Sequence, residues 1–161
     1  MANIFESPEM IGAFICETEE QLQLLENSIV ELEQNSETSE VVQELFRVAH
    51  TLKGSSATMG FEKMKTLTHE MENVLDKIRN GLLEISEPVI DALFECLDCL
   101  RMLMQDFAAD KNNIRTEITP VMDKLKEILS NNNPGNFSCK ADFFFSSRRR
   151  HTRFVLDAKE Q

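Results

Sequence analysis

The sequence predicts an all-α protein, built as an antiparallel up-down four-helix bundle with a fifth, C-terminal helix. Apolar residues recur along most of the 161-residue chain at alternating spacings of three and four, the period of an amphipathic helix. The chain has only 5 Gly and 4 Pro and has no Trp or Tyr, which argues against a turn-rich all-β fold. Hydrophobic residues make up 42% of the sequence, enough to fill a core.

The first two helices are expected in the first 60 residues. Ser7 is placed to cap the first helix, with Pro8 in its first turn and an end near residues 34–36. Its apolar stripe comprises Ile11, Phe14, Ile15, Thr18, Leu22, Leu25, Ile29 and Leu32. The second helix should start near residues 37–39 and end at Gly60, which suits a left-handed helix terminus. Its core face comprises Val42, Leu45, Ala49, Leu52, Ser56 and Met59.

Three more helices are expected before residue 131. The third follows at once and stops at residues 80–81, with Met64, Leu67, Met71, Val74, Leu75 and Ile78 inward. Ser86 is placed to cap the fourth, with Pro88 in its first turn, and its stripe comprises Ile90, Leu93, Leu97, Leu100, Met104 and Phe107. Residues 110–113 form a turn, and residues 119–120 start a shorter fifth helix carrying Leu125, Ile128 and Leu129.

The charge is divided unevenly along the chain. The net charge of −11 separates into −14 for residues 1–142 and +3 for residues 143–161. The acidic balance argues against nucleic acid or an anionic membrane as the main partner. A back-translation of residues 146–153 resembles a sequencing-library adapter, so we interpret residues 143–161 as a disordered, non-biological tail. The expected organisation is a domain at residues 1–130, a linker at 131–142 and this tail.

Cysteine usage and hydropathy predict a reduced, cytoplasmic protein. The four cysteines (Cys16, Cys96, Cys99 and Cys139) are too sparse for a disulfide scaffold. Cys96 and Cys99 have redox spacing but flank an apolar helical stripe, so buried thiols are the favoured interpretation. The N-terminus does not have the pattern of a signal peptide, and no apolar run is long enough to insert into a membrane.

The candidate chemistry centres on His50, which points away from the core stripe of the second helix towards solvent. Its nearest helical neighbours are Phe46, Lys53 and Gly54. A helical glycine costs about 1 kcal/mol relative to alanine. Gly54 leaves room beside the imidazole for a bulky group or an approaching partner.

The third helix carries a matching polar face with Lys65, His69, Glu72 and Asp76. An antiparallel arrangement brings His69 and Glu72 near His50, where a carboxylate bound to one ring nitrogen leaves the other as a nucleophile. Two alternatives stay open at this point. An exposed histidine is usually only solvated, and two histidines with a glutamate can bind a metal, although three ligands are few for such a site.

Residues 46–61, Phe-Arg-Val-Ala-His-Thr-Leu-Lys-Gly-Ser-Ser-Ala-Thr-Met-Gly-Phe, resemble the phosphorylation-site helix of histidine-containing phosphotransfer (HPt) domains. Residues 67–81, from Leu-Thr-His-Glu-Met-Glu to Asn-Gly, fit the second signature of that family. The resemblance is strongest to the N-terminal domain of CheA-type chemotaxis histidine kinases and covers residues 8–130.

The resemblance implies a role for each site residue. His50 would accept the phosphoryl group on the ring nitrogen farther from the backbone, and Glu72 would hold the proton of the other nitrogen. Lys53 and His69 would complete the polar network, and Gly54 would keep the ring accessible. The resemblance assigns no metal ligand and no cofactor to this chain.

The implied partners are a CheA-type kinase catalytic domain, which uses ATP, and response regulators of the CheY or CheB type. The chain has no Gly-rich phosphate loop, so it is not expected to bind ATP itself. The full-length parent would be a protein histidine kinase, and a monomer is expected for the isolated domain. A truncated CheA-type product is favoured over a free-standing HPt protein, and a purely structural helical adaptor is the remaining alternative.

Overall fold

The computed structural model describes residues 7–34 and 39–130, and these ranges form five α-helices and no strand. The helices are α1 (Pro8–Gln34), α2 (Ser39–Thr58), α3 (Glu62–Arg79), α4 (Glu87–Ala109) and α5 (Thr119–Ser130). Each predicted helix is present, and the starts and ends agree with the prediction to within a few residues. The all-α fold class is therefore confirmed.

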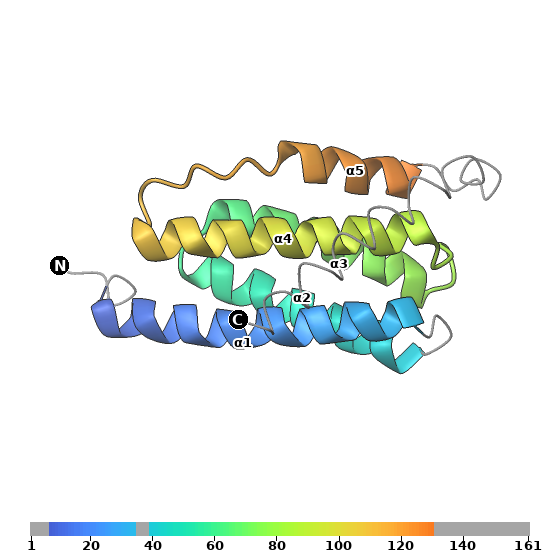
Figure 1. Ribbon diagram of the computed structural model, residues 1–161, viewed down its shortest axis with the longest axis horizontal. Helices are drawn as coiled ribbons and strands as arrows, with labels where there is room; N and C mark the ends of the chain where they lie inside the picture. Colours follow the sequence, from blue (N-terminus) through green and yellow to red (C-terminus); the bar gives the residue numbers. More distant parts are fainter. Residues whose placement is uncertain (1–6, 35–38, 131–161) are drawn as a thin grey trace, which may run out of the picture.

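Helices α1 to α4 close into a ring in which α1 packs against α2 and α4, and α3 packs against the same two helices. Consecutive helices run in opposite directions, and α5 lies outside the ring along α4 (Figure 1). Helix α5 contacts both α3 and α4. This is the predicted up-down bundle, with the fifth helix beside it.

The predicted stripes are the buried faces of the helices, with differences at the helix ends. The largest fully buried side chains are Leu25, Ile29, Leu32, Leu45, Leu52, Met64, Leu67, Met71, Leu75, Leu93, Leu97 and Leu100. Ile11, Ile15, Met59 and Leu129 are only partly buried, because they lie near the ends of the bundle. The sequence underestimated the burial of α4, which contacts three helices and also buries Val89, Ala92, Phe94, Cys96, Cys99 and Leu103. The buried-thiol interpretation of Cys96 and Cys99 is thus confirmed.

The helix ends follow the expected local chemistry, with one exception. The Ser7 hydroxyl oxygen accepts a hydrogen bond from the backbone N–H of Met10 at 3.2 Å, as an N-cap should. Gly60 and Gly81 end α2 and α3 with φ of 71° and 73°. Ser86 takes the N-cap position of α4 in extended backbone, but its hydroxyl makes no capping hydrogen bond.

Helix α5 is attached to the bundle through lysines. Lys124 on α5 lies 3.0 Å from Asp91 and 2.7 Å from Glu95 of α4. Burial would lower the pKa of Lys124, but its contacts with the two carboxylates raise it above the ordinary value. Lys77 of α3 donates a hydrogen bond to the carbonyl oxygen of Leu129 at 3.2 Å. Two ion pairs and a backbone contact therefore add to the burial of Met122, Leu125 and Ile128 in holding α5 against the bundle.

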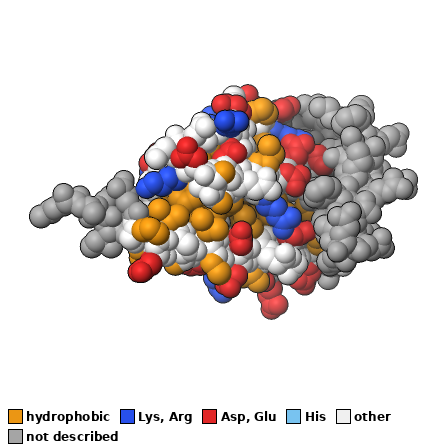
Figure 2. Space-filling model, turned by 60° about the vertical axis from the view of Figure 1, so that its left-hand side comes forward, with side chains coloured by type: hydrophobic (Ala, Val, Ile, Leu, Met, Phe, Trp, Pro, Cys, Tyr) orange, Lys and Arg blue, Asp and Glu red, His pale blue; other side chains and the backbone are white. Residues whose placement is uncertain are grey.

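The surface shows how the acidic charge is placed. Figure 2 shows one face of the molecule, on which acidic side chains are spread around an apolar area rather than gathered in one cleft. Among the described residues, no helix is long and apolar enough to cross a membrane. The predicted linker at 131–142, the tail at 143–161 and Cys139 lie outside the described residues.

Candidate functional site

His50 lies in α2 on the face opposite the core. Its side chain is 63% exposed, whereas its neighbours Ala49 and Leu52 are fully buried. The predicted orientation towards solvent is therefore what the structure shows. A histidine so placed offers a ring nitrogen to an approaching molecule without any conformational change of the bundle.

Glu72 of α3 reaches across to the histidine ring. Its Oε1 lies 3.1 Å from His50 Nδ1. Burial would raise the pKa of Glu72, but Lys53 and His50 together lower it, so the carboxyl group is ionised at neutral pH. An ionised carboxylate only accepts hydrogen bonds. The proton of the neutral imidazole is therefore on Nδ1, and Nε2 carries the free lone pair.

Lys53, one helical turn after His50, holds the other oxygen of the same carboxylate. Its Nζ lies 2.7 Å from Glu72 Oε2. This ion pair is the contact that stabilises Oε2, a buried atom with no well-aligned hydrogen bond among the described residues. The Glu72 side chain is only 13% exposed, although it belongs to the predicted polar face of the third helix, which should face solvent. It is covered because it lies over α2, between Lys53 and His50.

The other two predicted residues lie nearby without joining this network. His69 is exposed one turn before Glu72, and for this residue the described part of the chain provides no hydrogen bond or ion pair. A Cβ added at Gly54 would meet nothing within 4 Å, so the space beside the ring opens to solvent. The structure brings His50, Lys53 and Glu72 together and leaves His69 outside the free domain's network.

Two further residues extend the site, and the sequence indicated only one of them. The Phe46 ring lies parallel to the His50 ring, with 6.3 Å between centroids and 10° between planes. Arg79, in the last turn of α3, places its guanidinium carbon 4.1 Å from the Phe46 ring centroid. Phe46 was recognisable as the residue one turn before His50. Arg79 needed the α2–α3 pairing, because it lies far away in sequence.

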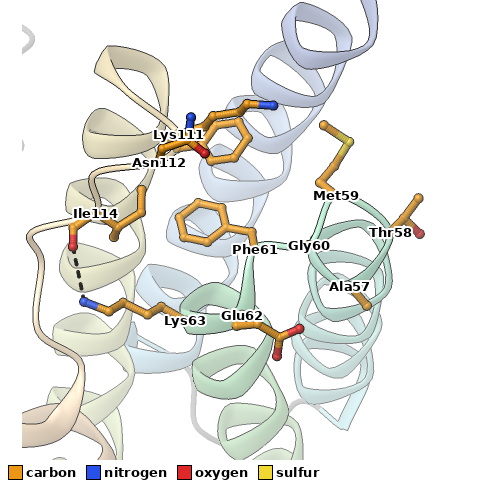
Figure 3. Close-up of a pocket in the computed structure, with 11 residues that line it drawn as sticks. Ala57, Thr58, Met59, Gly60, Phe61, Glu62, Lys63, Lys111, Asn112 and Ile114 are labelled. Carbon is orange, nitrogen blue, oxygen red and sulfur yellow. Dashed lines mark hydrogen bonds between the residues drawn. The ribbon is translucent and has the colours of Figure 1, made fainter. Parts of the chain in front are cut away.

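A surface cavity lies at another place, at the end of the bundle. It has a volume of about 630 Å³ and is lined by Ala57, Thr58, Met59, Gly60, Phe61, Glu62, Lys63, Phe107, Lys111, Asn112 and Ile114. In Figure 3, Phe61 points from the α2–α3 turn towards Asn112 and Ile114. Lys63 already donates to the carbonyl oxygens of Ile114 and Thr116. None of the residues around His50 lines this cavity, so the candidate site is an open helical face.

The chemistry available at that face is nucleophilic. A neutral imidazole with its Nδ1 proton bound to a carboxylate can attack an electrophile through Nε2, and the carboxylate stabilises the positive charge that then develops on the ring. Within residues 7–34 and 39–130, no three His, Cys, Asp or Glu side chains cluster as metal ligands.

The chain is similar to known proteins in sequence and in fold. The family model described as the Hpt domain matches residues 9–110. Chemotaxis protein CheA of Listeria monocytogenes is 44% identical over 97 residues, which cover 60% of this chain and 16% of that protein. CheA of Bacillus subtilis is 41% identical over 117 residues, which cover 73% of this chain and 17% of the relative. The chain thus spans about a sixth of the length of these relatives.

Solved structures show the same fold. The solution structure of the histidine phosphotransfer domain of CheA matches with a TM-score of 0.67 and 38% identity, over 73% of this chain and 90% of that one. The CheA phosphotransferase domain from Thermotoga maritima matches with a TM-score of 0.61 and 38% identity, over 66% and 99%. The phosphorylated P1 domain of CheA3 from R. sphaeroides, in complex with CheY6, shares the fold at 22% identity and a TM-score of 0.72, over 78% and 98%. With its family model covering most of the helical bundle, this chain belongs to the Hpt domain family.

Proposed function

We propose that this chain is the phosphotransfer domain of a CheA-type chemotaxis kinase, in which His50 carries the phosphoryl group. A separate kinase catalytic domain would supply that group from ATP, and an aspartate of a CheY- or CheB-type response regulator would receive it. The observation that carries the proposal is the exposed imidazole, whose Nδ1 is bound to Glu72 and whose Nε2 has no hydrogen-bond partner among residues 7–34 and 39–130. The similarity to CheA phosphotransfer domains supports the same assignment.

The proposed reaction is two successive in-line transfers. The lone pair of Nε2 attacks the γ-phosphorus of ATP, a bond forms from Nε2 to phosphorus, and the bond to the ADP oxygen breaks. The Nδ1 proton stays on the ring, so the phosphorylated ring is positively charged and paired with Glu72. An aspartate carboxylate of the regulator then attacks phosphorus, and the electron pair of the broken bond returns to Nε2.

The neighbouring residues have supporting roles in this proposal. Glu72 fixes the tautomer and stabilises the charged ring, and Lys53 holds Glu72 in its partly buried position. Lys53 also offers positive charge to the phosphoryl oxygens. His69, exposed and without a hydrogen bond or ion pair to the described residues, would join only once a phosphoryl group or partner is present. Gly54 leaves the approach to the ring open.

The proposal also covers the location, oligomeric state and partners of the domain. We place it in the cytoplasm as a monomer, with no nucleic-acid partner and without ATP binding of its own. A free-standing HPt protein would use the same surface and the same chemistry. A purely structural adaptor would not need a histidine whose tautomer is set by a carboxylate.

The deciding experiment is phosphorylation by a purified CheA catalytic domain with γ-labelled ATP. We expect the chain to acquire an acid-labile, alkali-stable label that then moves to added CheY. His50→Gln should abolish the label, whereas His69→Gln, the matched change at the other described histidine, should leave the acceptor in place. Equal labelling of wild type and His50→Gln would show that the assignment is wrong. Absence of label under every kinase tested would favour the adaptor.

A further inference from the structure

Three side chains form a continuous stack along the α2–α3 face. Phe46 lies one turn before His50, and the two rings are parallel, 10° apart with 6.3 Å between centroids. The Arg79 guanidinium lies over Phe46 at 4.1 Å. Arg79 is itself held by Asp76, at 2.6 Å between Nη2 and Oδ1. The stack therefore leads from an ion pair on α3 to the histidine on α2.

We propose that Phe46 is a positioning residue for His50, and that Arg79 holds Phe46 in place. This inference rests on the proposed function, because it concerns the direction in which Nε2 presents its lone pair. The roles proposed above for His50, Glu72 and Lys53 do not depend on this stack.

The need for such a residue follows from the exposure of the histidine. The His50 side chain is 63% exposed, and Glu72 contacts it at one atom, Nδ1. A single hydrogen bond leaves the ring free to swing about its side-chain torsions, and reaction depends on alignment of the attacking atom. A parallel aromatic ring on one side removes part of that freedom. Parallel, offset aromatic pairs at this separation attract each other beyond the area they bury.

Arg79 can support Phe46 because an ion pair with Asp76 restrains its guanidinium. Phe46 is only partly buried against the core, so one part of its ring faces outwards. A guanidinium over the face of a phenyl ring is attracted by the ring's electrons. The contact with Asp76 in the same helix holds the guanidinium. Helix α3 therefore sets the tautomer of His50 through Glu72 and supports the Phe46 ring through Arg79.

The inference predicts a change in the tautomer of His50 that loss of stability alone would not cause. Phe46→Leu keeps an apolar side chain but removes the flat ring, and Phe46→Tyr restores the ring. Without the flat ring, His50 should swing away from Glu72 more often, and the Nε2–H tautomer should gain population at the expense of Nδ1–H. Met59→Leu is the matched control, because Met59 is also partly buried against the core but lies just after the C-terminal end of α2, far from His50.

The test first measures the NMR chemical shifts of the His50 ring nitrogens, which report the tautomer, in the unphosphorylated full chain. It then measures the initial rate of phosphorylation. Phe46→Leu should shift the tautomer population and slow phosphorylation, each by about two- to tenfold. That range is the attraction energy of an aromatic pair converted to an equilibrium ratio. Phe46→Tyr should recover both values, Met59→Leu should change neither, and Arg79→Gln should give a smaller change in the same direction.

The outcomes separate this inference from the proposed function. A folded Phe46→Leu variant with the wild-type tautomer and rate overturns the positioning role, while His50 labelling would still support the carrier function. If wild type is not labelled, the carrier function fails and the tautomer comparison alone decides about Phe46. Should Phe46→Leu fail to fold, the partly exposed Arg79→Gln replaces it, and a wild-type tautomer in that variant overturns the inference.

Discussion

Replacing Glu72 by Gln keeps the shape of the side chain and removes its charge. In the native domain this carboxylate accepts from His50 Nδ1 at 3.1 Å and pairs with Lys53 Nζ at 2.7 Å. An amide in the same place can still accept from Nδ1–H. It cannot neutralise the positive ring that forms when Nε2 is phosphorylated, so the transfer rate should fall while the fold persists.

The size of the effect follows from the contacts. A hydrogen bond to a charged group contributes about 1.5–3 kcal/mol. Because the His50 side chain is 63% exposed and solvent screens the charge, the lower end applies. A loss of about 1.5 kcal/mol in the transition state corresponds to a rate about tenfold lower. The free energy of unfolding should fall by about 1 kcal/mol, since Lys53 loses its partner.

The pH dependence of stability gives an independent check. Lys53 and His50 lower the pKa of Glu72 despite the opposing effect of burial. A carboxyl group whose pKa is lowered in the folded state contributes its full stabilisation at pH values above the ordinary pKa of 4.5. The contribution is lost as the pH falls through the pKa of the folded state. The stability difference between wild type and Glu72→Gln should therefore be constant near neutral pH and shrink in acid.

The assay is single-turnover phosphorylation at saturating kinase domain, with urea unfolding of both proteins at neutral and acid pH. Glu70→Gln is the matched control, because it removes the same charge from the same helix two residues away. A Glu72→Gln rate within twofold of wild type would refute the charge-stabilisation argument. A stability difference that persists unchanged in acid would show that Glu72 acts through packing rather than charge.

Three further outcomes are expected. Gly54→Ala should raise the free energy of unfolding by about 0.5–1 kcal/mol in urea titrations, because its Cβ meets nothing within 4 Å, yet slow phosphorylation by narrowing the approach to the ring. Lys124→Met should lower the free energy of unfolding by about 1–2 kcal/mol, as two carboxylates of α4 lose their cation. Burial raises the pKa of the Cys96 and Cys99 thiols, so peptide mapping after brief alkylation of native protein should find Cys16 modified and these two protected.

The helices and most of the site could be predicted because both depend on local patterns. Apolar spacing identified the buried faces, and Gly60 and Gly81 marked the ends of α2 and α3 with the positive φ that glycine allows. The outward direction of His50 followed from the helical period alone. The extra burial of α4 could not be read from its sequence pattern, because it depends on α5 packing against a second face.

The choice of Glu72 over His69 as the partner of His50 depends on the register of two helices. His50 lies eleven residues before Phe61 at the α2–α3 turn, and Glu72 lies eleven after it. An antiparallel helical pair that turns at Phe61 therefore sets these two at the same height. His69 lies level with Lys53 instead and is exposed, whereas the long Lys53 side chain reaches along to Glu72.

The same register makes the alignment of the site residues depend on the short turn between α2 and α3. Phe46 and Arg79 lie fifteen residues before and eighteen after Phe61, so Arg79, like Lys53, bridges about one turn with a long side chain. The contacts that α3 makes to His50, Lys53 and Phe46 thus depend on the length of the turn that contains Gly60, whose φ is 71°. Since one residue more would rotate α3 by about 100° relative to α2, Glu72 and Arg79 would leave the face together. The conformation of this turn is therefore as much a part of the site as the side chains that it aligns.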